Sequence, residues 1–177
     1  MDSANPTPLQ LMQNPDVWAL YEHPPIPSYH RGRVAILGDA AHASTPHFGA
    51  GAGMALEDAF VLSHLLALCS ESADLGHAFA AYDAVRIPRT QGVVRESREQ
   101  GRVLDMQGEG AGDDLGKLAD KLDTRVRWIW NEDLIGHREK AVEAFRGSRD
   151  GKGLVDGIEK LEVKDEVVVS EALVEVV

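Results

Sequence analysis

The sequence predicts a mostly α-helical chain with one or a few short buried strands, part of a larger α/β fold. Three observations predict this class: an apolar run at residues 34–37 between two glycines, a glycine-rich segment directly after it, and helix-forming sequence over most of the remaining length. A strand that leads through a glycine-rich loop into a helix is typical of α/β proteins. Because a lone strand needs neighbours for its backbone hydrogen bonds, the sequence predicts only part of such a fold.

The first thirty residues predict one short helix followed by an extended connector. Asn14 can cap a helix, and Pro15 fits the first helical position because its missing N–H has no partner there. A short helix is therefore expected through residues 18–21. The three prolines between residues 24 and 27 then exclude regular helix and favour extended chain.

The next segment predicts a strand, a loop and a helix in that order. Residues 34–37 are wholly apolar and partly β-branched, which favours a buried strand that ends at Asp39. Residues 40–53 are small, rich in glycine and interrupted by Pro46, a composition typical of loops. From residue 54 to residue 69 the chain becomes strongly helix-forming.

Three further helical segments are predicted toward the C-terminus. Asp74 can cap a helix whose apolar stripe includes Tyr82, and Pro88 is expected to break or kink this helix. Apolar side chains recur at helical spacing over residues 115–129, and a last helix is expected over residues 134–146.

The composition indicates an ordinary globular chain and excludes several kinds of partner. Its 177 residues are 44% hydrophobic and 27% charged, with a formal net charge of −11. Binding to nucleic acid and to anionic membranes relies on basic surface, so neither is expected, and no segment resembles a membrane-spanning helix. The N-terminus lacks a signal-peptide pattern and the single Cys69 cannot form an internal disulfide, so a reducing cytoplasmic location is expected.

Candidate cofactor chemistry is concentrated between residues 38 and 54. Asp39 follows the predicted strand, where ligands of α/β sheets bind, and its carboxylate can accept hydrogen bonds from polyol hydroxyls. Gly49, Gly51 and Gly53 clear the approach to a helix N-terminus, whose free N–H groups and dipole favour a negative group. This combination suits a cofactor with a polyol chain and a ring that becomes negative on reduction, as in FAD.

Two histidines and two tryptophans leave alternatives open. His42 and His47 could form a metal-dependent site with Asp39, but no supporting ligand stands at a suitable spacing, so His42 is interpreted as a structural histidine and no metal is expected. His47 is interpreted either as a residue near a substrate or as an exposed loop residue. Trp128 and Trp130 are expected to pack in the core rather than to form a stacking platform.

Four charged residues are interpreted as structural. Glu57 and Asp58 fall in the first turns of the predicted helix, where the helix dipole favours carboxylates. Arg86 and Arg89 could anchor an anion, but ion pairs at the surface or between helices are the expected role.

The motif between residues 38 and 59 resembles the second flavin motif of the single-component FAD-dependent aromatic-ring monooxygenases, and within them it is most similar to the salicylate hydroxylase-like branch. The matching residues are Gly38, Asp39, His42, Pro46, Gly49, Gly51, Gly53, Glu57, Asp58 and Ala59. The similarity continues through residues 82–91 and 127–131, and it covers most of residues 18–145.

This resemblance implies an FAD-binding, Rossmann-like α/β fold of the aromatic hydroxylase type. It implies NAD(P)H as the reductant, O2 as the oxidant, and hydroxylation of a phenolic or aromatic acid resembling salicylate. The residues that it assigns to FAD are Gly38, Asp39, Gly49, Ala50, Gly51, Ala52, Gly53 and Met54. It places Pro46 and His47 at the catalytic face of the flavin.

The resemblance also divides the chain. Residues 1–30 are expected to connect from a substrate-binding region, residues 31–146 to form the C-terminal part of the FAD-binding domain with a helical extension, and residues 147–177 to form a flexible acidic tail. The family begins with a G-x-G-x-x-G turn for the ADP part of FAD, which this sequence lacks. The chain is thus expected to supply half of the FAD site, either as a truncated gene product or together with a separate N-terminal half on another polypeptide. The alternative is a non-catalytic helical interaction protein with a remnant of the fold.

Overall fold

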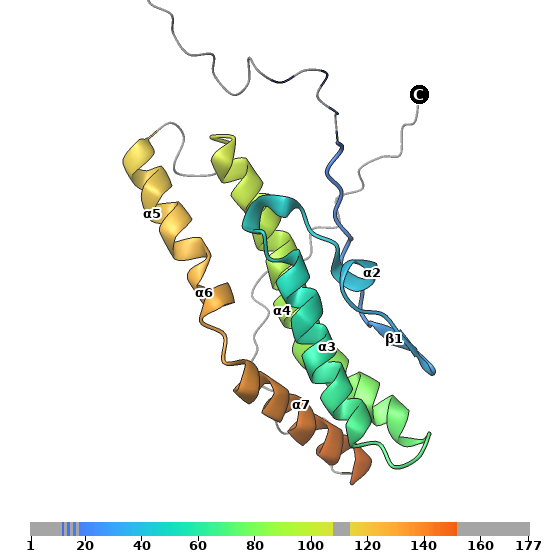
Figure 1. Cartoon of the computed structure of the whole chain (residues 1–177). Coiled ribbons are helices and arrows are strands. Elements are labelled where there is room, and N and C mark those ends of the chain that lie inside the picture. Colours follow the sequence, from blue (N-terminus) through green and yellow to red (C-terminus); the bar gives the residue numbers. More distant parts are fainter. Residues whose placement is uncertain (1–11, 13, 15, 17, 108–113, 152–177) are drawn as a thin grey trace, which may run out of the picture.

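The computed structural model describes residues 12, 14, 16, 18–107 and 114–151. Three long helices form its body, α3 (Gly51–Ala67), α4 (Asp74–Leu104) and α7 (Leu134–Arg149), and each packs against the other two. Figure 1 shows α3 running alongside α4, with α7 crossing near the C-terminal end of α3 and the start of α4. The predicted helices over residues 54–69 and 134–146 are therefore confirmed, and α7 continues three residues further.

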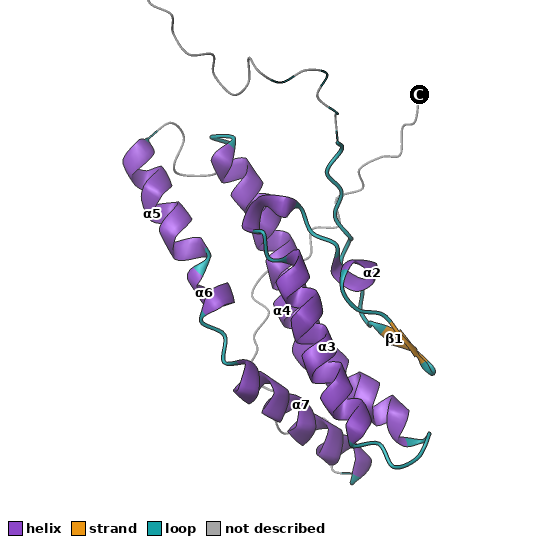
Figure 2. Cartoon of the chain, in the orientation of Figure 1, coloured by secondary structure: helices purple, strands orange, loops and turns teal. Residues whose placement is uncertain are grey.

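The shorter elements surround this body (Figure 2). In chain order they are β1 (His30–Arg31), β2 (Val34–Ala35), α2 (Asp39–His42), the 3-10 helix η1 (Pro46–Phe48), α5 (Leu115–Arg125) and α6 (Arg127–Trp130). The helical pattern predicted over residues 115–129 is confirmed, although Val126 divides it into α5 and α6. The prediction of a mostly helical chain with short strands is also confirmed.

The core lies where the three long helices meet. Apolar side chains that recur every three or four residues on α3 and α4 supply its centre, and α7 packs against them. The members of this cluster that are almost fully buried include Tyr29, Val61, Leu65, Ala81, Tyr82, Ala141 and Phe145. A second, smaller cluster of Met54, Val93 and Ile129 ties the first turn of α3 to α4 and α6.

The predicted buried strand over residues 34–37 is corrected. The structure has a two-stranded antiparallel hairpin in which His30 pairs with Ala35 and Arg31 pairs with Val34. Val34 is 67% exposed, because no third strand among the described residues covers the hairpin. The apolar run therefore predicted the presence of a strand correctly, but it did not predict that the strand is exposed.

The short helix expected over residues 18–21 is also wrong. These residues form no regular structure, and Trp18 is 81% exposed. A single helical turn fixes several backbone dihedrals for very few hydrogen bonds, so it needs packing to persist. The exposed Trp18 provides no such packing, and a favourable capping sequence alone does not stabilise a helix here.

Of the break or kink predicted at Pro88, the break does not occur. The helix continues from Asp74 to Leu104 with Pro88 inside it. A proline in a helix interior costs about 3 kcal/mol or more. Buried side chains on both sides of it, such as Tyr82 and Val93, hold the helix against its neighbours and offset this cost.

The loop predicted over residues 40–53 is shorter than expected. Residues 39–42 form one helical turn, residues 46–48 form the 3-10 turn, and α3 begins at Gly51. Of the tail predicted over residues 147–177, the residues from 152 onward lie outside the described part of the chain.

Candidate functional site

The Gly38–Asp39 turn is held against α3. Gly38 is buried with φ 59°, a backbone conformation that favours glycine, and a Cβ added to it would lie 3.2 Å from the Cβ of Ala55. Its carbonyl oxygen accepts hydrogen bonds from the amides of Ala41 and His42, both at 2.9 Å. The backbone is thus pressed onto α3 while the side chain of Asp39 stays exposed.

The N-terminus of α3 lies beside this turn. The helix begins at Gly51 after Ala50, and no side chain caps it. A Cβ added to Gly51 would lie 3.9 Å from Ser44 Oγ, and one added to Gly53 would meet nothing within 4 Å. The first N–H groups of a helix have no partner within the helix, so an accessible, electropositive surface results. Together with the exposed Asp39 carboxylate, this arrangement fits both the polyol chain and the ring of FAD.

Pro46 and His47 occupy the 3-10 turn between these two features. Pro46 is exposed and His47 is half-buried against α4. The His47 ring lies so close to Gly101 that a Cβ added there would be 2.6 Å from His47 Cδ2. Ser97 Oγ donates a hydrogen bond of 2.5 Å to the carbonyl oxygen of Thr45 and fixes the start of the turn. His47 is therefore a packed residue, not a freely exposed loop histidine.

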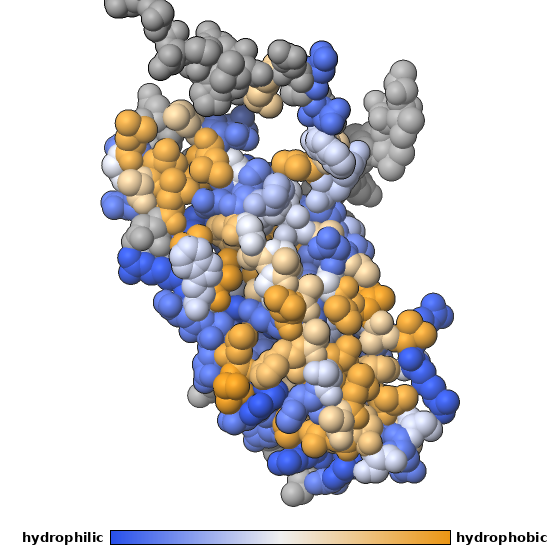
Figure 3. All heavy atoms as spheres, viewed as in Figure 1, coloured by the Kyte–Doolittle hydropathy of each residue, from blue (hydrophilic) through white to orange (hydrophobic). Residues whose placement is uncertain are grey.

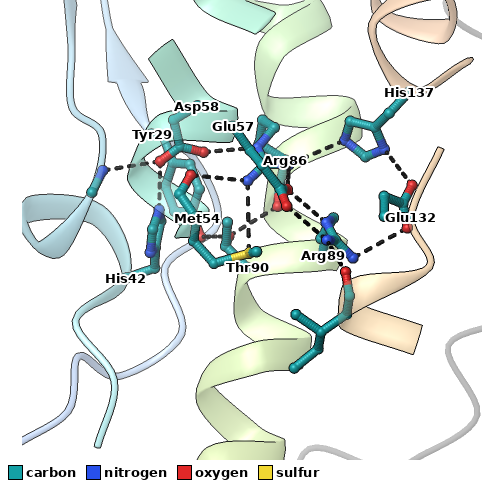
Figure 4. A network of polar contacts seen from close by, with 12 residues as sticks. Tyr29, His42, Met54, Glu57, Asp58, Arg86, Arg89, Thr90, Glu132 and His137 are labelled. Carbon is teal, nitrogen blue, oxygen red and sulfur yellow. Dashed lines mark hydrogen bonds and ion pairs between the residues drawn. The ribbon is translucent and has the colours of Figure 1, made fainter. Parts of the chain in front are cut away.

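A buried carboxylate, Asp58, connects the turn to α4 (Figure 4). Its Oδ2 accepts a hydrogen bond of 2.9 Å from the amide of Gly38 and lies 2.6 Å from His42 Nε2. Its Oδ1 accepts a hydrogen bond of 2.7 Å from Arg86 Nε. Three segments distant in sequence thus meet at one side chain.

The network continues from Arg86 toward α7. Glu57 Oε2 accepts hydrogen bonds from Arg86 Nη1 at 2.7 Å and from Arg89 Nε at 2.6 Å. Arg89 also pairs with Glu132 at 3.1 Å, and Glu132 lies 3.2 Å from His137 Nδ1. Figure 4 shows these side chains as one chain of polar contacts between α3, α4 and α7.

The electrostatics keep both carboxylates of α3 charged. Burial by itself raises the pKa of Asp58, but hydrogen bonds from His42 and the Gly38 amide and the charge of Arg86 outweigh it and hold that pKa below its ordinary value. Burial also raises the pKa of Glu57, and the hydrogen bond from Arg89 and the charge of Arg86 reverse this. Burial and the nearby Arg86 lower the pKa of His137.

The structural interpretation of several residues is confirmed, with a different cause for two of them. His42 is buried with its Nε2 2.6 Å from Asp58 Oδ2, as expected of a structural histidine. Glu57 and Asp58 are structural because they pair with buried arginines, not because of the helix dipole alone. The available sequence signal was two adjacent carboxylates inside an otherwise apolar segment.

The prediction that both tryptophans pack in the core is wrong, since Trp128 is 37% exposed and belongs to no core cluster among the described residues. Trp128 packs on Gly92 of α4, and the guanidinium of Arg89 lies 5.7 Å from its ring centroid. Trp130 is 76% exposed. Because α6 is a single turn beside α4, it buries Ile129 and turns Trp130 away from the core.

Comparisons with known proteins relate the chain to FAD-binding enzymes. A family model described as an FAD binding domain matches residues 22–97. The 6-methylsalicylate 1-monooxygenase atA of Aspergillus terreus is 42% identical over 77% of this chain and 31% of its own length. A salicylate hydroxylase of Pseudomonas putida is 42% identical over 71% of this chain and 29% of its own length.

The solved structure of a salicylate hydroxylase substrate complex superposes with a TM-score of 0.67 and 43% identity, over 70% of this chain and 30% of that chain. The chain therefore carries part of an FAD-binding domain of the aromatic hydroxylase fold. It is homologous to the salicylate hydroxylase-like FAD-dependent monooxygenases, and the resemblance inferred from the motif at residues 38–59 is confirmed. It spans about a third of the length of these relatives.

Proposed function

We propose that this chain supplies half of the FAD site of a monooxygenase that uses NAD(P)H and O2 to hydroxylate a phenolic or aromatic acid resembling salicylate. The observation that carries the proposal is the exposed carboxylate of Asp39 beside the uncapped, glycine-lined start of α3. The names of the relatives, a 6-methylsalicylate monooxygenase and a salicylate hydroxylase, support the class of substrate.

Each part of the site has a distinct role in this proposal. The Asp39 carboxylate accepts hydrogen bonds from the ribityl hydroxyls of FAD. The amide groups of residues 51–53 face the ring and stabilise negative charge on it, since the helix dipole places about half a positive charge there. Gly38, Gly49, Ala50 and Met54 shape the backbone that approaches the cofactor.

Bound FAD supplies the redox chemistry, accepting hydride from NAD(P)H and reacting with O2. The part of the chain nearest that chemistry is the 3-10 turn. We place exposed Pro46 against the flavin face and the half-buried His47 near the substrate, where they exclude water and orient the aromatic ring. The packing of His47 on Gly101 makes this turn rigid enough for that task.

Replacing Asp39 with alanine tests the flavin contact. We expect Asp39→Ala to weaken FAD binding by roughly 10- to 100-fold, because a hydrogen bond to a charged group contributes about 1.5–3 kcal/mol. Quenching of flavin fluorescence on titration with the protein measures the affinity. Asp120→Ala, an exposed aspartate on α5, is the matched control and should leave binding unchanged. Equal affinity of Asp39→Ala and the unaltered chain contradicts the assignment.

We further propose that a separate polypeptide carrying the ADP-binding half of the domain docks on the outer face of α3. This face consists of Ala52, Leu56, Ala59, Ser63 and Leu66, all exposed. It holds no charge, whereas exposed helix faces are normally charged or polar. Leu56 is 73% exposed, and Figure 3 shows apolar side chains gathered over this region. The greater length of the relatives supports such an occupant.

Charge placed on this face should prevent docking. The probe is the part of the Pseudomonas putida salicylate hydroxylase that precedes its matched segment, produced separately. We expect it to bind the unaltered chain and to lose at least tenfold in affinity for Leu56→Lys in calorimetry, since a buried unpaired charge is strongly unfavourable. Ile135→Lys, an exposed apolar position on α7, should have no effect. Self-association of the chain through Leu56 in sedimentation experiments contradicts the proposal.

Among the described residues no helix is long and apolar enough to cross a membrane. Cys69 is a free thiol. We propose that this free thiol lies in the reducing environment of the cytoplasm.

A further inference from the structure

Asp58 is a buried acid that the proposed flavin contacts do not use. Its side chain is fully buried, yet both carboxylate oxygens have partners from other segments. Oδ2 receives the Gly38 amide at 2.9 Å and lies 2.6 Å from His42 Nε2, while Oδ1 receives Arg86 Nε at 2.7 Å. The carboxylate therefore contacts the residue before Asp39 and the residue that ends α2.

The one-turn helix α2 depends on contacts of this kind. It contains only residues 39–42, and no side chain caps its N-terminus. Nucleation of a helix is unfavourable in free energy, so an isolated turn of four residues does not persist in water. Because Asp58 contacts Gly38 at one end of the turn and His42 at the other, it holds both ends of the segment that carries Asp39.

The same helix carries Asp58 and the amides of the site. Asp58 lies in α3, seven residues after Gly51 and about two turns from the N-terminus. A straight helix of this length is rigid. A carboxylate on it therefore sets the distance between Asp39 and the amide groups of residues 51–53.

We propose that Asp58 is a positioning residue that fixes the place of Asp39 relative to the start of α3. This inference rests on the proposed flavin site. Arg86 orients the Asp58 carboxylate from the side of α4, and His42 completes the contact from the side of α2. Asp58 itself reaches no cofactor, because it lies beneath the turn and is shielded from solvent.

The neighbouring Glu57 provides a matched control. It lies on the same helix, is also largely buried, and pairs with Arg86 and Arg89 in the same network. Its carboxylate accepts hydrogen bonds from Arg86 and Arg89 of α4, which lie away from the turn at residues 38–43. A purely stabilising role predicts similar behaviour for Asp58→Asn and Glu57→Gln, whereas a positioning role predicts a local difference at the turn.

Amide hydrogen exchange in the chain without cofactor tests the local effect. The reporters are the amides of Ala41, His42 and Ala43, which bond to the carbonyl oxygens of Gly38 and Asp39, and the reference is the amide of Leu65 in the core. We expect Asp58→Asn to speed exchange of the reporters by about tenfold or more relative to the reference, through local opening. Glu57→Gln should speed reporters and reference alike. The same uniform acceleration in Asp58→Asn overturns the proposal.

Titration with FAD tests the consequence for the site. We expect Asp58→Asn to weaken FAD binding by about tenfold or more and Glu57→Gln to stay within roughly threefold of the unaltered chain. Local opening in Asp58→Asn with unchanged FAD affinity overturns the positioning role. Absence of FAD binding by the unaltered chain, also after addition of the separately produced N-terminal part of the Pseudomonas putida salicylate hydroxylase, contradicts the proposed function instead. The exchange comparison then decides by itself whether Asp58 holds the turn.

Discussion

Replacing Arg86 with alanine should lower the free energy of unfolding by about 3–5 kcal/mol. The Arg86 side chain is fully buried and donates to Asp58 Oδ1 and Glu57 Oε2 at 2.7 Å and to the carbonyl oxygen of Met54 at 3.2 Å. Its removal leaves two buried carboxylates without their shared cation and a cavity between α3 and α4. Urea unfolding followed by circular dichroism measures the change.

The control for this variant is Arg102→Ala on the same helix. Arg102 also pairs with a glutamate, Glu99, at 2.7 Å, but its side chain is 58% exposed. An exposed pair of this kind contributes about 0–1 kcal/mol. Similar losses for Arg86→Ala and Arg102→Ala would mean that the buried network does not stabilise the helix pair.

Replacing Phe145 with alanine should also cost about 3–5 kcal/mol of unfolding free energy. Phe145 is 1% exposed and belongs to the main cluster, in which α7 packs on α3 and α4. The loss combines the transfer of an aromatic side chain with a cavity that rigid helices on either side cannot close. Thermal and urea unfolding both report it.

Ile135→Ala is the matched control on α7. Ile135 is 51% exposed, so its truncation removes little buried surface and should change stability by less than about 1 kcal/mol. If Phe145→Ala costs no more than Ile135→Ala, α7 is not an integral part of the core, and the helical body consists of α3 and α4 alone.

The long helices and the resemblance carried by the motif at residues 38–59 were the parts most accessible from sequence. Long segments with periodic apolar residues, such as α3 and α7, contain many local interactions that favour the same conformation. The motif beginning at Gly38 was equally clear, because positive φ and close backbone approach restrict the residue that can stand there.

The elements that were predicted wrongly depend on what surrounds them. The strand signal at Val34 and the helix signal at Trp18 are local, but the side chains there are exposed in the structure. Pro88 does not break α4 because the packing of this helix against α3 and α7 outweighs the free-energy cost of a proline in a helix interior. In each case tertiary contacts decided between conformations that differ by only a few kcal/mol.

By itself the sequence determined the long helical segments, the motif that begins at Gly38 and the relation to FAD-dependent monooxygenases, because each depends on residues close together in the chain. Only the tertiary structure decided that Asp58 joins Gly38, His42 and Arg86. Arg86 lies 28 residues beyond Asp58, on a different helix. Contacts across that separation form through the packing of α3 against α4, a property that local spacing does not encode.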